Sequence, residues 1–251
     1  MTPLNIIILA AGKGTRMKSE LPKVAHKVND IPMIDYVINA SKSAGASEIY
    51  IVIGHQAETL KTLINDNTLI YVEQKEQLGT GHAVQQVAPH IKESTNSITM
   101  VLAGDCPLIS AQTLKALLET HHSTQAKASI LTTKLDDPAA YGRILKNEHG
   151  QVIAIREAKD CTEDELKVSE INSGIYCFDT QKLFNALEKT NTNNKQGEYY
   201  LTDVIEILKQ DGGTISAYCT KNSHEVLGVN TKEDLRHIET LAQKINVPHS
   251  T

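Results

Sequence analysis

Residues 5–17 read NIIILAAGKGTRM, a short β-branched run that leads directly into a glycine-rich turn. The run is short and no basic segment precedes it, so it predicts a buried strand rather than the apolar core of a signal peptide. Two glycines and small alanines allow backbone N–H groups to approach a ligand closely. Lys13 and Arg16 add positive charge that suits phosphate. The pattern therefore favours a phosphate-binding turn at the carboxyl end of the first strand.

Two well-known nucleotide motifs do not fit this turn. No Gly-Lys-Ser/Thr follows at P-loop spacing, and Met17 stands where the third glycine of the dinucleotide fingerprint belongs, with no helix expected after it. Residues 21–23, LPK, add a third cation, because Pro22 holds the backbone and Lys23 lies in the same loop as Arg16. From spacing alone a purely structural turn fits as well as a functional one. The nearby cations favour phosphate binding.

The first half of the chain alternates short strand-like runs with helical patterns. This alternation predicts an α/β fold with a doubly wound, mostly parallel (Rossmann-like) sheet, whose ligands bind beyond the carboxyl ends of the strands. Pro32 and Gly45 suit the two ends of one helix, and Ser110 suits the N-cap of another. The expected strands are 5–9, 48–53, 69–72, 98–102 and 128–133, and the expected helices are 33–44, 57–64, 80–87 and 110–122.

After about residue 135 the pattern becomes mixed, which predicts a second lobe packed on the same sheet. Strand-like pieces lie near 144, 151–156 and 173–178, and helical patterns at 180–188, 201–210 and 233–245, with a polar loop at 190–197. We divide the chain into a nucleotidyltransferase domain, 1–232, and a C-terminal helix and tail, 233–251.

Composition narrows the class of protein. The 251 residues are 40% hydrophobic and 22% charged, which suits one large folded domain. A formal net charge of -5 gives no global basic field, so a nucleic-acid partner is not expected. The four cysteines form no CxxC pair or zinc-ligand spacing. No apolar run approaches the roughly 20 residues needed to cross a bilayer, so we expect a cytoplasmic protein without a membrane partner.

Residues 9–17 and 21–23 resemble the signature of sugar-nucleotide pyrophosphorylases. Further stretches narrow the resemblance to the uridylyltransferase domain of the bacterial bifunctional N-acetylglucosamine-1-phosphate uridylyltransferases, over residue 4 to about 240. They are 74–83 (QKEQLGTGHA), 104–108 (GDCPL), 141–144 (YGRI), 170–174 (EINSG) and 196–203 (QGEYYLTD). The resemblance implies a fold of the nucleotide-sugar transferase type with a mixed sugar-binding lobe.

The resemblance also implies a set of site residues. Arg16 and Lys23 would be catalytic, and Asp105 and Asn230 would hold Mg²⁺. Residues 9–12 would lie against uracil and ribose, Gln74 with Gly79 and Thr80 would read the uracil edge, and three residues would hold the amino sugar. The substrate-binding set is Leu9, Ala10, Ala11, Gly12, Gly14, Lys23, Gln74, Gly79, Thr80, Ala103, Gly104, Asp105, Gly142, Glu157, Asn172 and Asn230, of which Gly142, Glu157 and Asn172 would hold the sugar.

Taken alone, several of these residues allow simpler explanations. Thr80 could be a helix N-cap, Asp105 an N-cap or turn residue before Pro107, Asn230 a turn residue and Glu157 a surface charge. Asp105 does follow an expected strand, which places its carboxylate at the edge of the sheet where ligands bind.

The activity implied by the resemblance is transfer of UMP from UTP to N-acetyl-α-D-glucosamine 1-phosphate, giving UDP-N-acetylglucosamine and pyrophosphate for cell-envelope precursors such as peptidoglycan and lipopolysaccharide. The acetyltransferase half of such proteins is a β-helix of hexapeptide repeats, and no acetyltransferase activity is expected from this chain. Two alternatives stay open. One is a uridylyl- or thymidylyltransferase for another sugar 1-phosphate, and the other is a non-catalytic nucleotide-sugar sensor.

Overall fold

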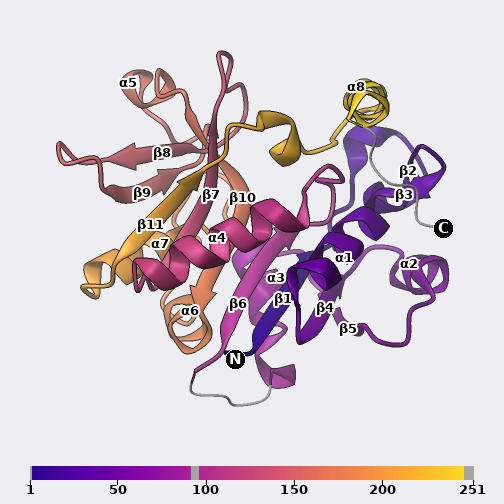
Figure 1. The fold of residues 1–251 in the computed structure, drawn as a ribbon, viewed down its shortest axis with the longest axis horizontal. Coiled ribbons are helices and arrows are strands. Elements are labelled where there is room, and N and C mark those ends of the chain that lie inside the picture. The colour runs from indigo at the N-terminus through magenta and orange to yellow at the C-terminus, as the bar shows by residue number, and fades with distance from the viewer. Residues whose placement is uncertain (1, 92–95, 246–251) are drawn as a thin grey trace.

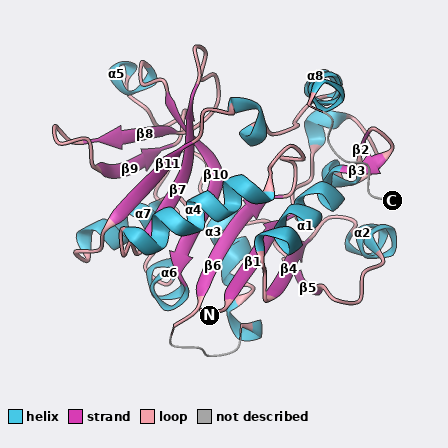
Figure 2. Cartoon of the chain, in the orientation of Figure 1, coloured by secondary structure: helices cyan, strands magenta, loops and turns pink. Residues whose placement is uncertain are grey.

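The computed structural model describes residues 2–91 and 96–245. In this part of the chain a nine-stranded sheet runs through the molecule with helices on both faces (Figures 1 and 2). One half of the sheet is parallel, in the order β6 (Ile98–Ala103), β1 (Leu4–Leu9), β4 (Glu48–Ile53), β5 (Ile70–Glu73). This half confirms the strands expected from the sequence and the doubly wound arrangement.

The other half of the sheet begins with a long strand that reverses direction. β10 (Glu170–Asp179) is antiparallel both to β6 and to β7 (Ala128–Lys134), and β11 (Ile215–Cys219) is parallel to β7. Seven of the nine strands follow one another in the order β11-β7-β10-β6-β1-β4-β5. Four of the six neighbouring pairs in this order are parallel, so the expectation of a mostly parallel sheet is confirmed.

Helices cover the two faces of the sheet because side chains alternate along each strand. In β1, Ile6 and Ile8 join the core beneath one helical layer, whereas Ile7 joins the core on the opposite face. α1 (Met33–Ala44) and α4 (Ala111–Ser123) form the first layer and cross in front of the sheet in Figure 1. The opposite layer consists of α3 (Thr80–Gln85), α6 (Thr180–Leu187) and α7 (Asp203–Gln210).

The mixed lobe expected after residue 135 is built around the start of β10. β8 (Arg143–Lys146) and β9 (Val152–Arg156) form an antiparallel hairpin, and β8 also pairs with β10. The short helix α5 (Glu163–Leu166) lies beside this hairpin. The sequence pattern did not predict α5, β11 or the small ribbon of β2 (Lys27–Val28) and β3 (Ile31–Pro32).

A third apolar cluster, separate from the cores on the two faces of the sheet, packs the last helix against the loop that follows β1. α8 (Lys232–Lys244) buries Ile238 and Ala242 against Met17, which belongs to the glycine-rich turn, and Val28. The remaining elements are α2 (Ala57–Ile64) and the 3-10 turns Thr15–Met17, Lys23–Ala25, Ala88–His90 and Ser223–Val226. The turn Thr15–Met17 corrects the expectation that no helix follows the glycines, because one 3-10 turn forms there.

Most of the helix ends that residue types suggested are confirmed. The helix expected after Pro32 begins at Met33 and ends before Gly45, whose φ of 98° suits glycine. Ser110 caps α4, its side chain accepting from the N–H of Thr113 at 3.1 Å. Thr80 is not an N-cap: Gly79 takes that position, and the Thr80 hydroxyl accepts from the N–H of Leu201 at 3.1 Å.

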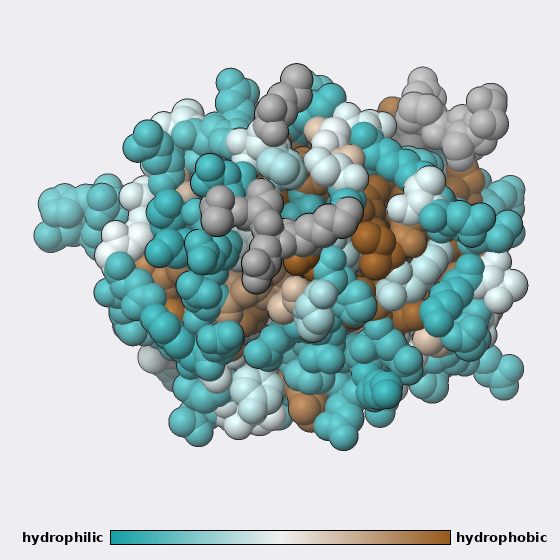
Figure 3. Space-filling view, turned by 90° about the horizontal axis from the view of Figure 1, so that it is seen from below, coloured by the Kyte–Doolittle hydropathy of each residue, from teal (hydrophilic) through white to brown (hydrophobic). Residues whose placement is uncertain are grey.

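The view in Figure 3 shows hydrophilic side chains over most of one face, with hydrophobic ones gathered near its centre. Among the described residues, none of the helices is both long enough and apolar enough to span a membrane.

Candidate functional site

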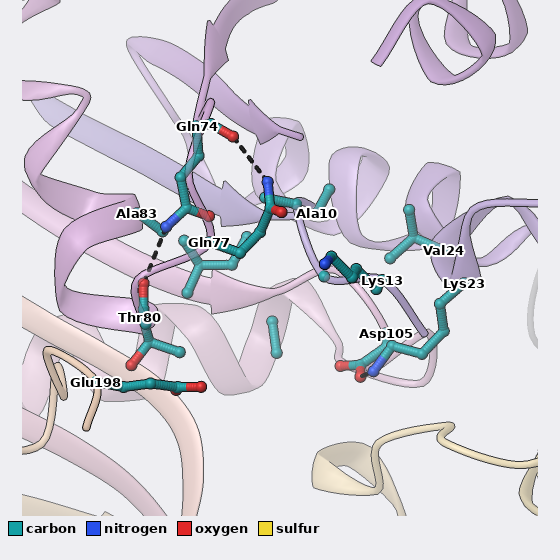
Figure 4. A pocket seen from close by; sticks show the side chains of 15 residues that line it. Ala10, Lys13, Lys23, Val24, Gln74, Gln77, Thr80, Ala83, Asp105 and Glu198 are labelled. Carbon is teal, nitrogen blue, oxygen red and sulfur yellow. Dashed lines mark hydrogen bonds and ion pairs between the residues drawn. The ribbon is translucent and has the colours of Figure 1, made fainter. Parts of the chain in front are cut away.

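A pocket of 540 Å³ opens at the carboxyl ends of β1 and β6. Many of the residues expected from the sequence line it (Figure 4). Those residues are Leu9, Ala10, Ala11, Gly12, Lys23, Gln74, Gly79, Thr80, Ala103 and Asp105. Lys13, Val24, Gln77, Ala83 and Glu198 complete the lining. Gln77 and Glu198 were not assigned from the sequence, although both lie within stretches that carried the resemblance.

The glycine-rich turn follows β1, and hydrogen bonds to neighbouring segments hold the backbone at its start. The N–H of Ala10 donates to the carbonyl of Val52 at 2.9 Å, and the N–H of Gly104 donates to that of Leu9 at 3.0 Å. A Cβ at Gly104 would lie 2.9 Å from the same Leu9 oxygen, so a side chain there would push the two loops apart. Gly12 faces open space instead.

Gly14 brings the LPK loop against the turn. Its φ of 59° is left-handed, and a Cβ there would lie 2.7 Å from the Cβ of Lys23. The absence of a side chain at Gly14 therefore lets Lys23 reach the end of the pocket.

Two cations and two oxygen-bearing side chains meet at this end. The Lys23 ammonium pairs with Asp105 Oδ2 and lies 3.2 Å from Asn230 Oδ1. Arg16 Nη2 donates to the same Asn230 oxygen at 3.0 Å. The side chains of Lys23 and Asp105 are only 18% and 16% exposed, so water screens their attraction less than at an open surface. Arg16, Asn230, Gly14 and Gly104 thus join the site from just outside the lining of the pocket.

Asn230 reaches the site because the start of α8 holds it. Its N–H donates to Asp234 Oδ2 at 2.9 Å, and Thr231 and Asp234 form a reciprocal capping box. The N–H of Val229 donates to the carbonyl of Asp105 at 3.0 Å, which ties this loop to the end of β6. A Cβ at Gly228 would lie at ordinary contact distance, 3.6 Å from Asp105 Oδ1 and 3.8 Å from Asn230 Nδ2, so this backbone runs directly beside both side chains.

The donor set fits a hard cation that needs few protein ligands. Within the described ranges, no group of three or more His, Cys, Asp and Glu residues could hold a metal ion. Asp105 and Asn230 nevertheless turn oxygens toward one point, which the Lys23 ammonium shares. Magnesium commonly takes one or two protein oxygens and completes its shell with water and phosphate oxygens. These two residues therefore suit magnesium better than zinc.

Gln74 and Thr80 lie at the other end of the pocket from Lys23 and Asp105 (Figure 4). Gln74 is 3% exposed, and its Nε2 donates to the carbonyl of Gly79 at 3.0 Å. Gly79 has a φ of 113°, and a Cβ there would lie 2.5 Å from the carbonyl oxygen of Tyr199. The loop that contains Tyr199 therefore closes directly over this end.

The three residues expected to hold the sugar gather in the mixed lobe. The N–H of Asn172 donates to the carbonyl of Gly142 at 2.9 Å, and Asn172 Nδ2 donates to the Tyr176 hydroxyl at 2.6 Å. Glu157 lines a second pocket of 140 Å³ and accepts from the Thr202 hydroxyl at 3.4 Å. Burial raises the pKa of Glu157, and burial together with the neighbouring charge of Glu157 raises the pKa of Tyr176. None of the three residues lines the larger pocket.

Two more carboxylates line the smaller pocket and were not expected from the sequence. Burial and the neighbouring charge of Glu206 raise the pKa of Asp203 to about 6. Asp160 Oδ2 is buried without a hydrogen-bond partner. Sequence alone offered no local signal for Asp160, since an isolated aspartate in a loop is ordinary. Asp203 ends a stretch that carried the resemblance.

A doubly wound sheet with a glycine turn and paired cations at the ends of its central strands defines a nucleotide-binding α/β protein. The chain belongs to the nucleotidyl transferase family, whose model matches residues 5–230.

Relatives extend this finding over nearly the whole chain. The bifunctional protein GlmU of Geobacillus sp. (strain WCH70) is 48% identical over 95% of this chain and 51% of its own length. That of Clostridium novyi (strain NT) is 47% identical over 97% of this chain and 53% of its own length. The chain thus spans about half the length of the curated relatives it matches.

A solved structure bears out the fold. The crystal structure of UDP-glucose pyrophosphorylase complexed with UDP-glucose covers 98% of this chain and all of its own, with a TM-score of 0.78 and 20% identity. The likeness confirms the nucleotide-sugar transferase type of fold expected from the sequence.

Proposed function

We propose that the chain transfers UMP from UTP to N-acetyl-α-D-glucosamine 1-phosphate, forming UDP-N-acetylglucosamine and pyrophosphate. The observation that carries this proposal is the meeting of Lys23, Arg16, Asp105 and Asn230 beside the glycine turn. Relatives named GlmU, at 46–48% identity over most of the chain, support it. The matched sequence stretches, which resemble the uridylyltransferase half of that bifunctional family, support the choice of UTP and of the amino sugar.

The reaction forms one bond and breaks another at the α-phosphorus of UTP. A phosphate oxygen of the sugar 1-phosphate attacks that phosphorus, and the bond to the oxygen bridging to the β-phosphate breaks. Pyrophosphate leaves with the bonding electron pair. The nucleophile is already an anion at neutral pH, so no general base is required. Positioning and charge stabilisation therefore supply most of the rate enhancement.

Different residues of the site would bind the nucleoside, the phosphates, the metal ion and the sugar. The backbone of residues 9–12 lies where it can contact the nucleoside, and Gln74 supplies an amide to the base edge. Lys23 and Arg16 neutralise charge on the attacking and leaving phosphates. Asp105 and Asn230 would hold Mg²⁺, which when bound supplies positive charge to the phosphate oxygens. Glu157 and Asn172 would accept and donate hydrogen bonds to the sugar.

A pyrophosphate-release assay tests the proposal. We expect the purified chain with magnesium to release pyrophosphate fastest with UTP and N-acetylglucosamine 1-phosphate. CTP and dTTP, and glucose 1-phosphate and galactose 1-phosphate, are the comparison substrates. No release with the proposed pair would overturn the proposal. Faster release with another sugar 1-phosphate would keep the reaction class and change the sugar, whereas nucleotide binding without release would indicate a sensor.

A further inference from the structure

The amide of Gln74 presents one particular end to the pocket. Its Nε2 donates to the carbonyl oxygen of Gly79 at 3.0 Å and lies 3.1 Å from Nδ1 of His82. An amide nitrogen carries two hydrogens, and these two partners use both of them. The nitrogen of Gln74 therefore has no hydrogen left for a ligand.

The oxygen of the same amide is open. Among the described residues none donates a hydrogen bond to Gln74 Oε1, and this atom is not one of the buried polar atoms without a partner. Since the residue is only 3% exposed and lines the pocket, the pocket is the space that Oε1 can reach. In Figure 4 a dashed line marks the hydrogen bond of the Gln74 amide nitrogen, which goes to the Gly79 carbonyl, and the amide oxygen points in another direction. Gln74 thus offers the pocket an acceptor.

Two acceptors on firmly held elements enforce this orientation. Gly79 is fixed because its loop pairs with the backbone of Tyr199, where the N–H of Gly81 donates to the Tyr199 carbonyl at 2.8 Å. His82 belongs to α3, and its ring lies 6.4 Å from that of Tyr199. If the Gln74 amide turned over, Oε1 would face the Gly79 oxygen, which is a repulsive contact, and His82 would have to carry its proton on Nδ1 to keep its own contact.

The proton on His82 follows from the same contacts. Nδ1 must be unprotonated to accept from Gln74, so the ring proton lies on Nε2. Gln86 covers Nε2, with its amide nitrogen 3.1 Å away. An amide can turn over to serve either tautomer, so Gln86 does not decide where the proton lies. Gln74 does, because its nitrogen is the end of the amide that also donates to the Gly79 carbonyl.

We propose that His82 is a positioning residue for nucleobase selection, which holds the acceptor of Gln74 toward the base. The pocket then selects a pyrimidine whose facing edge carries an N–H donor, as N3 of uracil or thymine does. Cytosine is disfavoured because its N3 is itself an acceptor. This inference rests on the proposed nucleotidyl transfer and assigns His82, which does not line the pocket, a part in its specificity.

Two variants at one position separate positioning from packing. His82→Phe keeps a ring but removes the acceptor, whereas His82→Asn places a side-chain oxygen close to where Nδ1 lies. We expect His82→Phe to lower the ratio of kcat/KM for UTP to that for CTP by about tenfold, since the Gly79 carbonyl alone then opposes rotation of the amide that would turn its NH₂ toward cytosine N3. His82→Asn should keep most of the ratio. Thermal unfolding midpoints verify that both variants fold.

Unchanged selectivity in a folded His82→Phe variant would overturn the inference, as would equal loss in both variants. The unmodified protein gives a second test that needs no variant: UTP methylated at N3 lacks the donor and should compete poorly with UTP. Competition as strong as that of UTP itself would also overturn it. If the protein turns over neither nucleotide, the proposed function fails, and equilibrium binding of UTP against CTP by the same variants still decides the role of His82.

Discussion

The ammonium of Lys23 lies between the side-chain oxygens of Asp105 and Asn230, where a bound cation would also lie. Arg16 approaches the same Asn230 oxygen from the glycine turn. The Asp105 carboxylate thus already has an internal cation as its partner, so a metal ion has to displace the Lys23 ammonium. Phosphates of a bound nucleotide would attract Lys23 and Arg16 away from these oxygens.

We therefore expect Lys23→Met to bind Mn²⁺ more tightly in the absence of nucleotide. The gain should be about tenfold, since a hydrogen bond to a charged group contributes on the order of 1.5 kcal/mol. Titration of Mn²⁺ followed by electron paramagnetic resonance measures it. Lys13→Met is the control, because Lys13 lines the same pocket without bonding to Asp105. Asp105→Asn should weaken binding, and no difference between the two lysine variants would contradict the argument.

Arg16→Ala should lower kcat far more than it raises the KM for the sugar phosphate. We expect the guanidinium to stabilise negative charge that develops on the phosphates in the transition state. Removing such a donor costs on the order of a hundredfold in kcat. Steady-state kinetics with both substrates varied provide the measurement, and Arg16→Lys serves as the charge-retaining comparison. Equal effects on kcat and KM, or no effect on either, would refute this role.

Asp203 gives the stability of the fold a pH dependence. Its pKa is about 6 in the folded protein, above the usual 3.8. Between these values the native protein keeps a proton that the unfolded chain has released, so this group lowers the free energy of unfolding as pH rises from about 4 to 6. We expect Asp203→Asn to stabilise the protein at pH 7, by on the order of 1 kcal/mol, and to have little effect at pH 4.

Urea unfolding at the two pH values measures this difference. Asp164→Asn is the matched control, since Asp164 also lies in the first turn of a helix but its carboxylate is highly exposed. A gain at pH 4 as large as that at pH 7 would show that the substitution acts through something other than ionisation.

At the scale of the element, α8 matters for its first turn. Thr231 and Asp234 satisfy each other's backbone N–H groups, and Asp234 also accepts from the N–H of Asn230. The same helix buries Ile238 against the apolar cluster that includes Met17. One helix therefore fixes both the backbone of Asn230 and the end of the glycine turn.

Thr231→Ala should lower the free energy of unfolding by about 1 kcal/mol, as loss of an N-cap usually does. It should also weaken Mn²⁺ binding, because the start of α8 holds Asn230. Thr162→Ala provides a control, since Thr162 forms the same capping box at α5, away from the larger pocket. If both variants lose Mn²⁺ affinity equally, α8 has no particular role in placing Asn230.

At the scale of the whole molecule, the pocket is closed by segments about 120 residues apart. Gly79 packs against the backbone of Tyr199, while Thr80 accepts from the N–H of Leu201. These contacts join the parallel half of the sheet to the second lobe. The base end of the pocket exists only when both lobes are docked.

Gly79→Ala should therefore destabilise the protein and weaken nucleotide binding. The φ of 113° costs a non-glycine residue on the order of 1–3 kcal/mol, and the new Cβ would collide with the Tyr199 backbone. Gly212→Ala separates the two effects, because Gly212 has a φ of 79° but open space around it. Chemical unfolding and equilibrium nucleotide binding provide the readouts. Equal losses of stability and of nucleotide affinity in the two variants would show that the contact between Gly79 and Tyr199 contributes to neither.

Local interactions control the features that could be predicted from the amino-acid sequence. β-branched runs, the glycine turn, Ser110 and Gly45 predicted the central strands and several helix ends, because each depends on neighbours a few residues away. The matched stretches also indicated which residues would gather at the carboxyl ends of β1 and β6. Ten of them line one pocket.

Features that depend on pairing between distant segments could be seen only in the folded chain. The pairing of β11, the reversal of β10 and the docking of Tyr199 on Gly79 follow from which surfaces meet, not from any local pattern. The hydroxyl of Thr80 is an example: its sequence context suggested an N-cap, but the hydroxyl binds Leu201 instead. Likewise, the acceptor that Gln74 turns to the pocket depends on two neighbouring acceptors that the fold brings to it, because an isolated amide can face either way.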